Sequence, residues 1–154
     1  EAGCRVSIFI AADPAQIEAA HRIGAEVIEL HTGAYCDFHA AGDFAARDAE
    51  LDRLREMAAM AHDLGLEVHA GHGLTYDTVT PIAALPQVME LNIGHFLIGE
   101  SIFRGLQPAI AEMRRLMADP AEIDRVLADG AERAATVADP VVDEVKKIVG
   151  FWRA

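Results

Sequence analysis

Two histidines, each beside a glycine, follow two predicted strands in residues 67–105. His72 lies in the turn 71–73 after a short strand, and His95 follows Gly94 after a strand over 88–93. Each turn precedes a predicted helix. Glycine lets a ligand approach the backbone closely, and a helix N-terminus offers unpaired N–H groups to an anion. The two turns therefore fit a phosphate site. The spacing alone equally fits tight turns with histidines that are satisfied by neighbouring groups.

The chain before these turns is predicted to begin with a strand and a capped helix. Residues 6–10 (VSIFI) are typical of a buried strand. Asp13 is predicted as the N-cap and Pro14 as the first helical residue, with Gln16 completing a capping box. This helix should end near Gly24 and pack its apolar residues inward, namely Ile17, Ala20 and Ile23.

A second strand, a long helix and a final apolar helical face are predicted next. Glu29 and His31 share one face of the strand 27–32. Asp43 should cap a helix that ends at Gly65, with apolar residues near helical spacing at Phe44, Leu51, Leu54, Ala58 and Ala61. A continuous apolar face is predicted at Ile98, Ile102, Leu106, Ile110, Met113 and Met117. Four strands thus alternate with four helices, which predicts an α/β fold with a parallel sheet, half of a TIM (βα)₈ barrel.

The composition and net charge argue against several classes of function. The formal net charge of −12 argues against non-specific binding to nucleic acid or to anionic membranes. No apolar run reaches membrane-spanning length and no secretory signal is evident. Cys4 and Cys36 form no metal-binding pattern and suggest reduced thiols, so we expect a cytoplasmic protein. The first residue is Glu1 rather than Met, so a segment of a longer protein or a trimmed chain is expected.

Four separated motifs resemble the pyridoxine 5′-phosphate synthase family, in the family's order. They are VSIFIAAD (6–13), IELHTGAY (28–35), AGHGLTY (70–76) and ELNIGH (90–95). The resemblance covers about residues 1–117 and matches the C-terminal half of that family's barrel. It implies condensation of 3-amino-2-oxopropyl phosphate with 1-deoxy-D-xylulose 5-phosphate to pyridoxine 5′-phosphate, phosphate and water, in vitamin B6 biosynthesis. It further implies phosphorylated substrates, no cofactor and a homo-oligomer.

The resemblance also implies roles for five residues. His72 corresponds to the family's proton donor, and Glu29 to the glutamate that stabilises the cationic stages of the reaction. Phosphate would be held by Gly73, Gly94 and His95. The family's first half carries an Asn-x-Asp-His type motif, arginines and two proton acceptors that have no counterpart here. Activity of this chain alone is therefore an open question, and a non-catalytic phosphate-binding half-barrel or assembly module is the alternative.

A metal site is a further alternative, because several histidines could converge at the strand ends: His31, His69, His72 and His95. No helical H-E-x-x-H spacing and no thiolate cluster supports zinc, so no metal is assigned.

The character of the sequence changes at Asp119, which predicts a domain over 1–118 and a helical extension over 119–154. Asp-Pro pairs should begin two helices, at Pro120 and Pro140. This tail loosely resembles the C-terminal end of tryptophanyl-tRNA synthetases but has none of their ATP-binding or tRNA-charging motifs, so it implies no function. A half-barrel has two open sheet edges. We expect self-association of two half-barrels, with a cover by the tail helices through Phe151 or Trp152, or poor solubility, as the alternatives.

Overall fold

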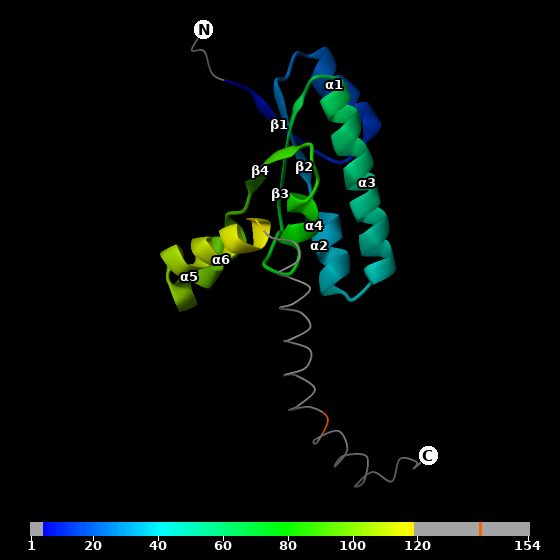
Figure 1. Cartoon of the computed structure of the whole chain (residues 1–154). Helices are drawn as coiled ribbons and strands as arrows, with labels where there is room; N and C mark the ends of the chain where they lie inside the picture. Colours follow the sequence, from blue (N-terminus) through cyan, green and yellow to red (C-terminus); the bar gives the residue numbers. More distant parts are fainter. Residues whose placement is uncertain (1–4, 119–138, 140–154) are drawn as a thin grey trace, which may run out of the picture. The chain divides into compact units, whose positions relative to one another are not determined.

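A computed structural model of the chain describes residues 5–118 and 139. The chain divides into two compact units, Glu1–Ala118 and Asp119–Ala154 (Figure 1). The predicted tail helices lie outside the described residues, as do Cys4, Phe151 and Trp152.

Four parallel strands form one sheet in the first unit. They are β1 (Ser7–Ile10), β2 (Val27–His31), β3 (Glu67–Gly71) and β4 (Val88–Asn92), paired in the order β1-β2-β3-β4. Helices connect successive strands (Figure 1). This architecture confirms the predicted α/β class and is consistent with half of a (βα)₈ barrel. β1 and β4 are the edges of the sheet, as expected.

The described residues form six helices, where four were predicted. They are α1 (Pro14–Arg22), α2 (Gly33–Ala40), α3 (Phe44–Asp63), α4 (Val79–Ala83), α5 (His95–Arg104) and α6 (Leu106–Ala118). No sequence pattern predicted α2. The prediction of one continuous apolar face from Ile98 to Met117 is wrong, because the chain breaks at Gly105, whose φ is 85°. Ile98, Ile102, Leu106 and Met117 are exposed as a result, whereas Met113 is buried.

The helix starts agree with the predicted caps, but several details differ. The Asp13 side chain accepts from the Gln16 N–H at 3.1 Å, while the Gln16 side chain accepts from the Ala11 N–H rather than closing a capping box on Asp13. Ile23 does not pack inward: α1 ends at Arg22, and Ile23 is 73% exposed. At α3, Asp43 accepts from the Ala46 N–H, and the predicted core positions Leu54, Ala58 and Ala61 are buried. Leu51 packs partly buried against that core, whereas Phe44, the first residue of α3, is exposed.

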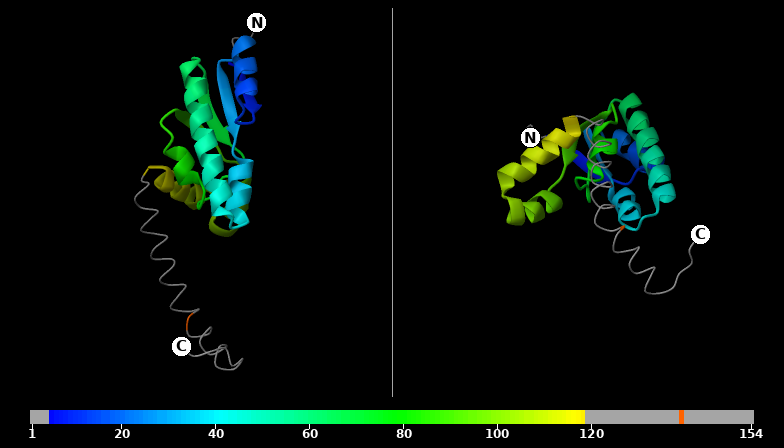
Figure 2. Two further views of the ribbon diagram at one scale, coloured as in Figure 1. Left: turned by 90° about the vertical axis from the view of Figure 1, so that its right-hand side faces the viewer. Right: turned by 60° about the horizontal axis from the view of Figure 1, so that its bottom comes forward.

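The two faces of the sheet have different chemistry. One face is apolar and packs on α1 and α3, which lie on the same side of the sheet (Figure 2). Its buried strand residues are Ile28, Leu30, Val68 and Ala70. On the other face, strand pairing aligns one row across all four strands: Phe9, Glu29, His69 and Glu90. The face that would line the interior of a barrel is therefore largely polar.

Candidate active site

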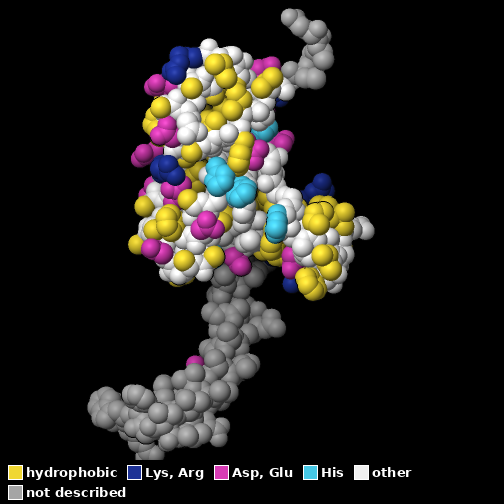
Figure 3. Space-filling model, turned by 180° about the vertical axis from the view of Figure 1, so that it is seen from behind, with side chains coloured by type: hydrophobic (Ala, Val, Ile, Leu, Met, Phe, Trp, Pro, Cys, Tyr) yellow, Lys and Arg dark blue, Asp and Glu magenta, His cyan; other side chains and the backbone are white. Residues whose placement is uncertain are grey.

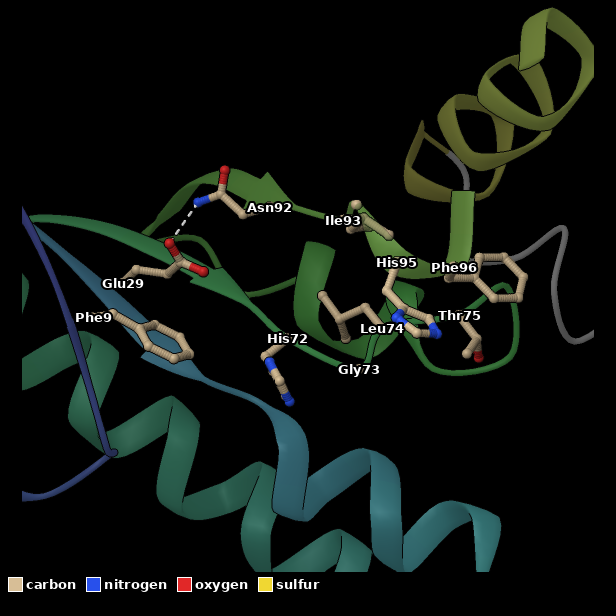
Figure 4. A pocket seen from close by; sticks show the side chains of 11 residues that line it. Phe9, Glu29, His72, Gly73, Leu74, Thr75, Asn92, Ile93, His95 and Phe96 are labelled. Carbon is tan, nitrogen blue, oxygen red and sulfur yellow. Dashed lines mark hydrogen bonds between the residues drawn. The ribbon is translucent and has the colours of Figure 1, made fainter. Parts of the chain in front are cut away.

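A cavity of about 630 Å³ lies at the C-terminal ends of β2, β3 and β4. All five predicted site residues line it (Figure 4). The complete lining is Phe9, Glu29, His72, Gly73, Leu74, Thr75, Asn92, Ile93, Gly94, His95 and Phe96. In parallel α/β sheets, ligands bind at this end of the strands, in loops held by the sheet. The cavity therefore lies where the fold places ligand sites.

The carboxylate of Glu29 is oriented by the neighbouring strands. Asn92 Nδ2 on β4 donates a hydrogen bond to Glu29 Oε2 at 2.9 Å (Figure 4). Between them on β3 lies Gly71, where an added Cβ atom would clash with Glu29 Oε1 and lie 2.9 Å from the backbone oxygen of Asn92. Only glycine at position 71 leaves room for the carboxylate between the strands. A negative charge held this way can stabilise positive charge developing on a bound molecule.

His72 adopts an unusual backbone conformation. Its φ is 80°, and Gly73 follows with a φ of 83°. A side chain in this region costs about 1 to 3 kcal/mol and persists only where the surroundings enforce it. The ring of His72 stacks on that of His31 with centroids 4.5 Å apart, and the Phe9 ring lies 5.1 Å from His31. His72 is exposed towards the cavity and has the side chain best suited to exchange protons near neutral pH.

Gly94 and His95 form the opposite wall of the cavity. Gly94 is the N-cap of α5 and His95 is its first residue, so the first N–H groups of a ten-residue helix lie at the cavity. An added Cβ atom at Gly94 would meet nothing within 4 Å, which leaves the backbone open to a ligand. The adjoining Phe96 packs edge-on against Tyr76, with centroids 4.6 Å apart. Tyr76 in turn donates to the Ala109 backbone oxygen at 3.1 Å, which ties this wall to α6.

Few charged side chains line the cavity. Glu29 is the one carboxylate of the lining, and the lining contains no Lys or Arg from the described part of the chain. Histidine side chains gather near the centre of one face of the molecule (Figure 3). An anion at this wall would therefore contact helix N–H groups and imidazoles rather than a strong cation.

The histidines considered for zinc do not form one cluster. His72 and His95 line the cavity, and His31 stacks behind His72. His69 instead lies between Glu67 Oε1, at 2.8 Å from its Nε2, and Glu90 Oε1, at 3.7 Å from its Nδ1. Within residues 5–118, no group of three His, Cys, Asp or Glu side chains is placed to hold a metal ion.

Several lining residues were missed by the sequence analysis. Asn92 and Phe9 belong to the motifs quoted above, but only the pairing of the strands shows that they adjoin Glu29. Thr75 and Phe96 lie one or two residues beyond the predicted glycine and histidine positions. Their place immediately after the two strand ends is the signal that could have identified them.

A parallel α/β sheet with a cavity at the C-terminal ends of its strands is consistent with the class of (βα)₈ barrels, of which this chain would form half. Residues 1–119 match the family described as pyridoxal phosphate biosynthesis protein PdxJ, and the chain belongs to this family.

Curated relatives agree over the same region. The chain is 86% identical over 117 residues to the pyridoxine 5′-phosphate synthase of Roseobacter denitrificans and 83% identical over 117 residues to that of Ruegeria pomeroyi. The enzyme of the same name from Jannaschia sp. is 72% identical. In each case the match covers 76% of this chain and 47% of the relative. The chain thus spans about half the length of the relatives it matches.

Proposed function

We propose that this chain supplies the C-terminal half of a pyridoxine 5′-phosphate synthase. The reaction is the condensation of 3-amino-2-oxopropyl phosphate with 1-deoxy-D-xylulose 5-phosphate to pyridoxine 5′-phosphate, phosphate and water. The observation that carries the proposal is the single cavity lined by Glu29, His72, Gly73, Gly94 and His95. High identity to relatives with that name supports it.

Each of the five residues has a role that its position in the cavity permits. His72 donates a proton to the departing oxygen, since imidazole exchanges protons near neutral pH. Glu29, held by Asn92 at 2.9 Å, stabilises the cationic stages. Gly73, Gly94 and His95 bind a phosphate group through backbone N–H groups and the His95 ring. No cofactor is required by this assignment.

The lack of Lys and Arg in the described cavity lining bears on how the chain works. A phosphate ester carries nearly two negative charges, and one helix N-terminus supplies only about half a positive charge. We therefore infer that further cationic groups reach the cavity from outside this lining, either from the N-terminal half of the barrel or from another copy in a homo-oligomer. The proposed partners are phosphorylated small molecules, with no nucleic acid or membrane. No helix in residues 5–118 is long and apolar enough to cross a bilayer. The proposed location is the cytoplasm.

Product formation tests the proposal. The chain is incubated with both substrates, alone and with the N-terminal half of a relative supplied in trans. We expect product in the complemented mixture, and we expect His72→Asn to lower kcat by about 10²- to 10⁴-fold. His62→Asn, which changes an exposed histidine on α3, is the matched control and should have no effect. An unchanged rate with His72→Asn would contradict the assigned role.

The alternative is a phosphate-binding half-barrel without catalysis, which the lack of Lys and Arg in the described cavity lining favours. It predicts no product even after complementation. Phosphate binding distinguishes a folded site from an unassembled one. In an NMR titration, inorganic phosphate should shift the amides of Gly73 and Gly94 and the ring of His95. Unchanged resonances at millimolar phosphate would show that this chain does not form the phosphate-binding site.

A further inference from the structure

The hydroxyl of Thr32 has an unexpected partner. Thr32 is the N-cap of α2, where a threonine oxygen ordinarily accepts from the N–H of the second or third helical residue. Here the side chain makes no such cap. Thr32 Oγ1 instead reaches the turn after β3, 2.8 Å from the Gly71 carbonyl oxygen and 2.7 Å from the His72 carbonyl oxygen. The side chain thus connects two loops rather than capping its own helix.

The Thr32 hydroxyl has one proton to donate, and the His72 carbonyl oxygen is the acceptor with fewer other donors. The Gly71 oxygen already accepts from the Thr32 N–H at 2.8 Å. The His72 oxygen has only one other neighbouring donor in the described structure, the weakly donating Cys36 Sγ at 3.9 Å. Thr32 is fully buried, so no water can replace its hydroxyl. Without that donor, the His72 carbonyl oxygen would keep only the weak Cys36 thiol as a donor.

The carbonyl that Thr32 contacts and the imidazole at the cavity belong to the same strained residue. His72 is the one non-glycine residue with positive φ in residues 5–118. With this φ of 80°, the His72 carbonyl oxygen lies 2.7 Å from Thr32 Oγ1 while its ring stacks on His31 at the cavity. His31 is held in turn, because its Nδ1 accepts from the Gly33 N–H at 3.2 Å. An added Cβ atom at Gly33 would lie 3.1 Å from His72 Cδ2, so the stack leaves no space for a larger residue there.

We propose that Thr32 is a positioning residue for His72: its hydroxyl holds the His72 carbonyl inward and thereby keeps the imidazole stacked on His31 at the mouth of the cavity. The proposal deepens the proposed function, because it concerns the group assigned there as proton donor. Thr32 itself does not line the cavity.

The test compares two variants of the full chain by NMR. Thr32→Val keeps the shape and removes the hydroxyl, whereas Thr32→Ser keeps the hydroxyl and removes the methyl group. In the unaltered chain we expect nuclear Overhauser effects between the rings of His31 and His72. Thr32→Val should abolish these effects and shift the amides of His72 and Gly73, and Thr32→Ser should restore both.

Thr80→Val provides the matched control. Thr80 is also buried, and its hydroxyl donates to the Leu116 backbone oxygen at 3.2 Å, away from the cavity. This variant should lower stability and leave the ring-to-ring effects intact. Retention of the effects in folded Thr32→Val would overturn the proposal, as would their loss in Thr32→Ser.

A direct measurement on the unaltered chain covers the case in which Thr32→Val does not fold. The Thr32 hydroxyl proton should exchange slowly with solvent, and a rapidly exchanging hydroxyl would overturn the proposal. None of these readouts requires turnover. Product formation by His72→Asn would refute the proposed function without affecting them.

Discussion

At the scale of single residues, the site depends on backbone positions as much as on functional groups. All five predicted residues line the cavity. The glycines and histidines after the strand ends are local signals, but the choice of these five, Glu29 among them, came from the family resemblance. The sequence did not predict the partners that orient them. Asn92 adjoins Glu29 across 63 residues of sequence, and Thr32 holds the turn at His72 across 40 residues. Such contacts follow from the pairing of strands, which one sequence does not specify.

Gly71→Ala tests the space for the Glu29 carboxylate. The new Cβ atom would clash with Glu29 Oε1, so we expect a loss of about 1 to 3 kcal/mol of stability. The side-chain amide resonances of Asn92 should shift as its hydrogen bond to Glu29 breaks. Gly99→Ala, within α5, is the control, because its Cβ atom would meet nothing within 4 Å. It should be neutral or stabilising by up to about 1 kcal/mol. Equal losses in both variants would contradict the steric argument.

The burial of Tyr35 predicts that the folded protein loses stability at high pH. Burial is the main cause that raises the pKa of Tyr35 to about 12, although the charge of Arg47 opposes it. Because folding favours the neutral phenol, this contribution is complete below about pH 10 and is lost as the pH rises towards 12. The shift corresponds to about 2 to 3 kcal/mol. In denaturant unfolding, the free energy of unfolding should therefore fall as the pH rises from about 9 towards 12.

Tyr35→Phe is the matched variant for this measurement. It loses the hydrogen bond from the Tyr35 hydroxyl to the Thr78 backbone oxygen, 3.2 Å long, which costs about 1 kcal/mol at neutral pH. It should lack the alkaline loss that the tyrosine causes. An alkaline loss of the same size in both proteins would assign it to other groups.

At the scale of elements, periodicity and caps predicted the four strands and the starts of α1 and α3. They failed at α2 and at the break between α5 and α6. α2 begins at a glycine and buries Gly33, Tyr35 and Cys36, so it lacks the polar face of a typical surface helix. The break between α5 and α6 lies within a regular apolar repeat. A glycine at this position is compatible with a continuous helix, and only the backbone angles of the structure reveal the break.

Gly105→Ala tests that break. Gly105 has a φ of 85° and a ψ of 149°, a combination that is essentially restricted to glycine. Its Cβ atom would make only an ordinary contact, 3.6 Å from Pro108 Cδ, so the cost is conformational. We expect a loss of about 1 to 3 kcal/mol in denaturant unfolding. A gain in helical circular dichroism without loss of stability would indicate that α5 and α6 can join into one helix.

At the scale of the whole molecule, the sheet face opposite α1 and α3 is largely polar. The row across the four strands contains Glu29, His69 and Glu90, with Phe9 at one edge. Exposed apolar residues instead gather on α5 and at the start of α6, where Phe103 is 85% exposed and Ile102 is 77% exposed. This helical pair projects from the β4 side of the sheet (Figures 1 and 2).

The open edges of the sheet predict self-association, and β4 allows a specific test. Met89 on this edge strand is 73% exposed, at an irregularity in the pairing with β3. A lysine on an exposed edge opposes pairing with another strand. Met89→Lys should therefore reduce the mass measured by light scattering while changing the free energy of unfolding by less than about 0.5 kcal/mol. Ile23→Lys is the matched control, because Ile23 is also 73% exposed but caps the end of α1. If both variants associate as the unaltered chain does, the β4 edge is not the contact, and the exposed face of α5 and α6 becomes the surface to alter next.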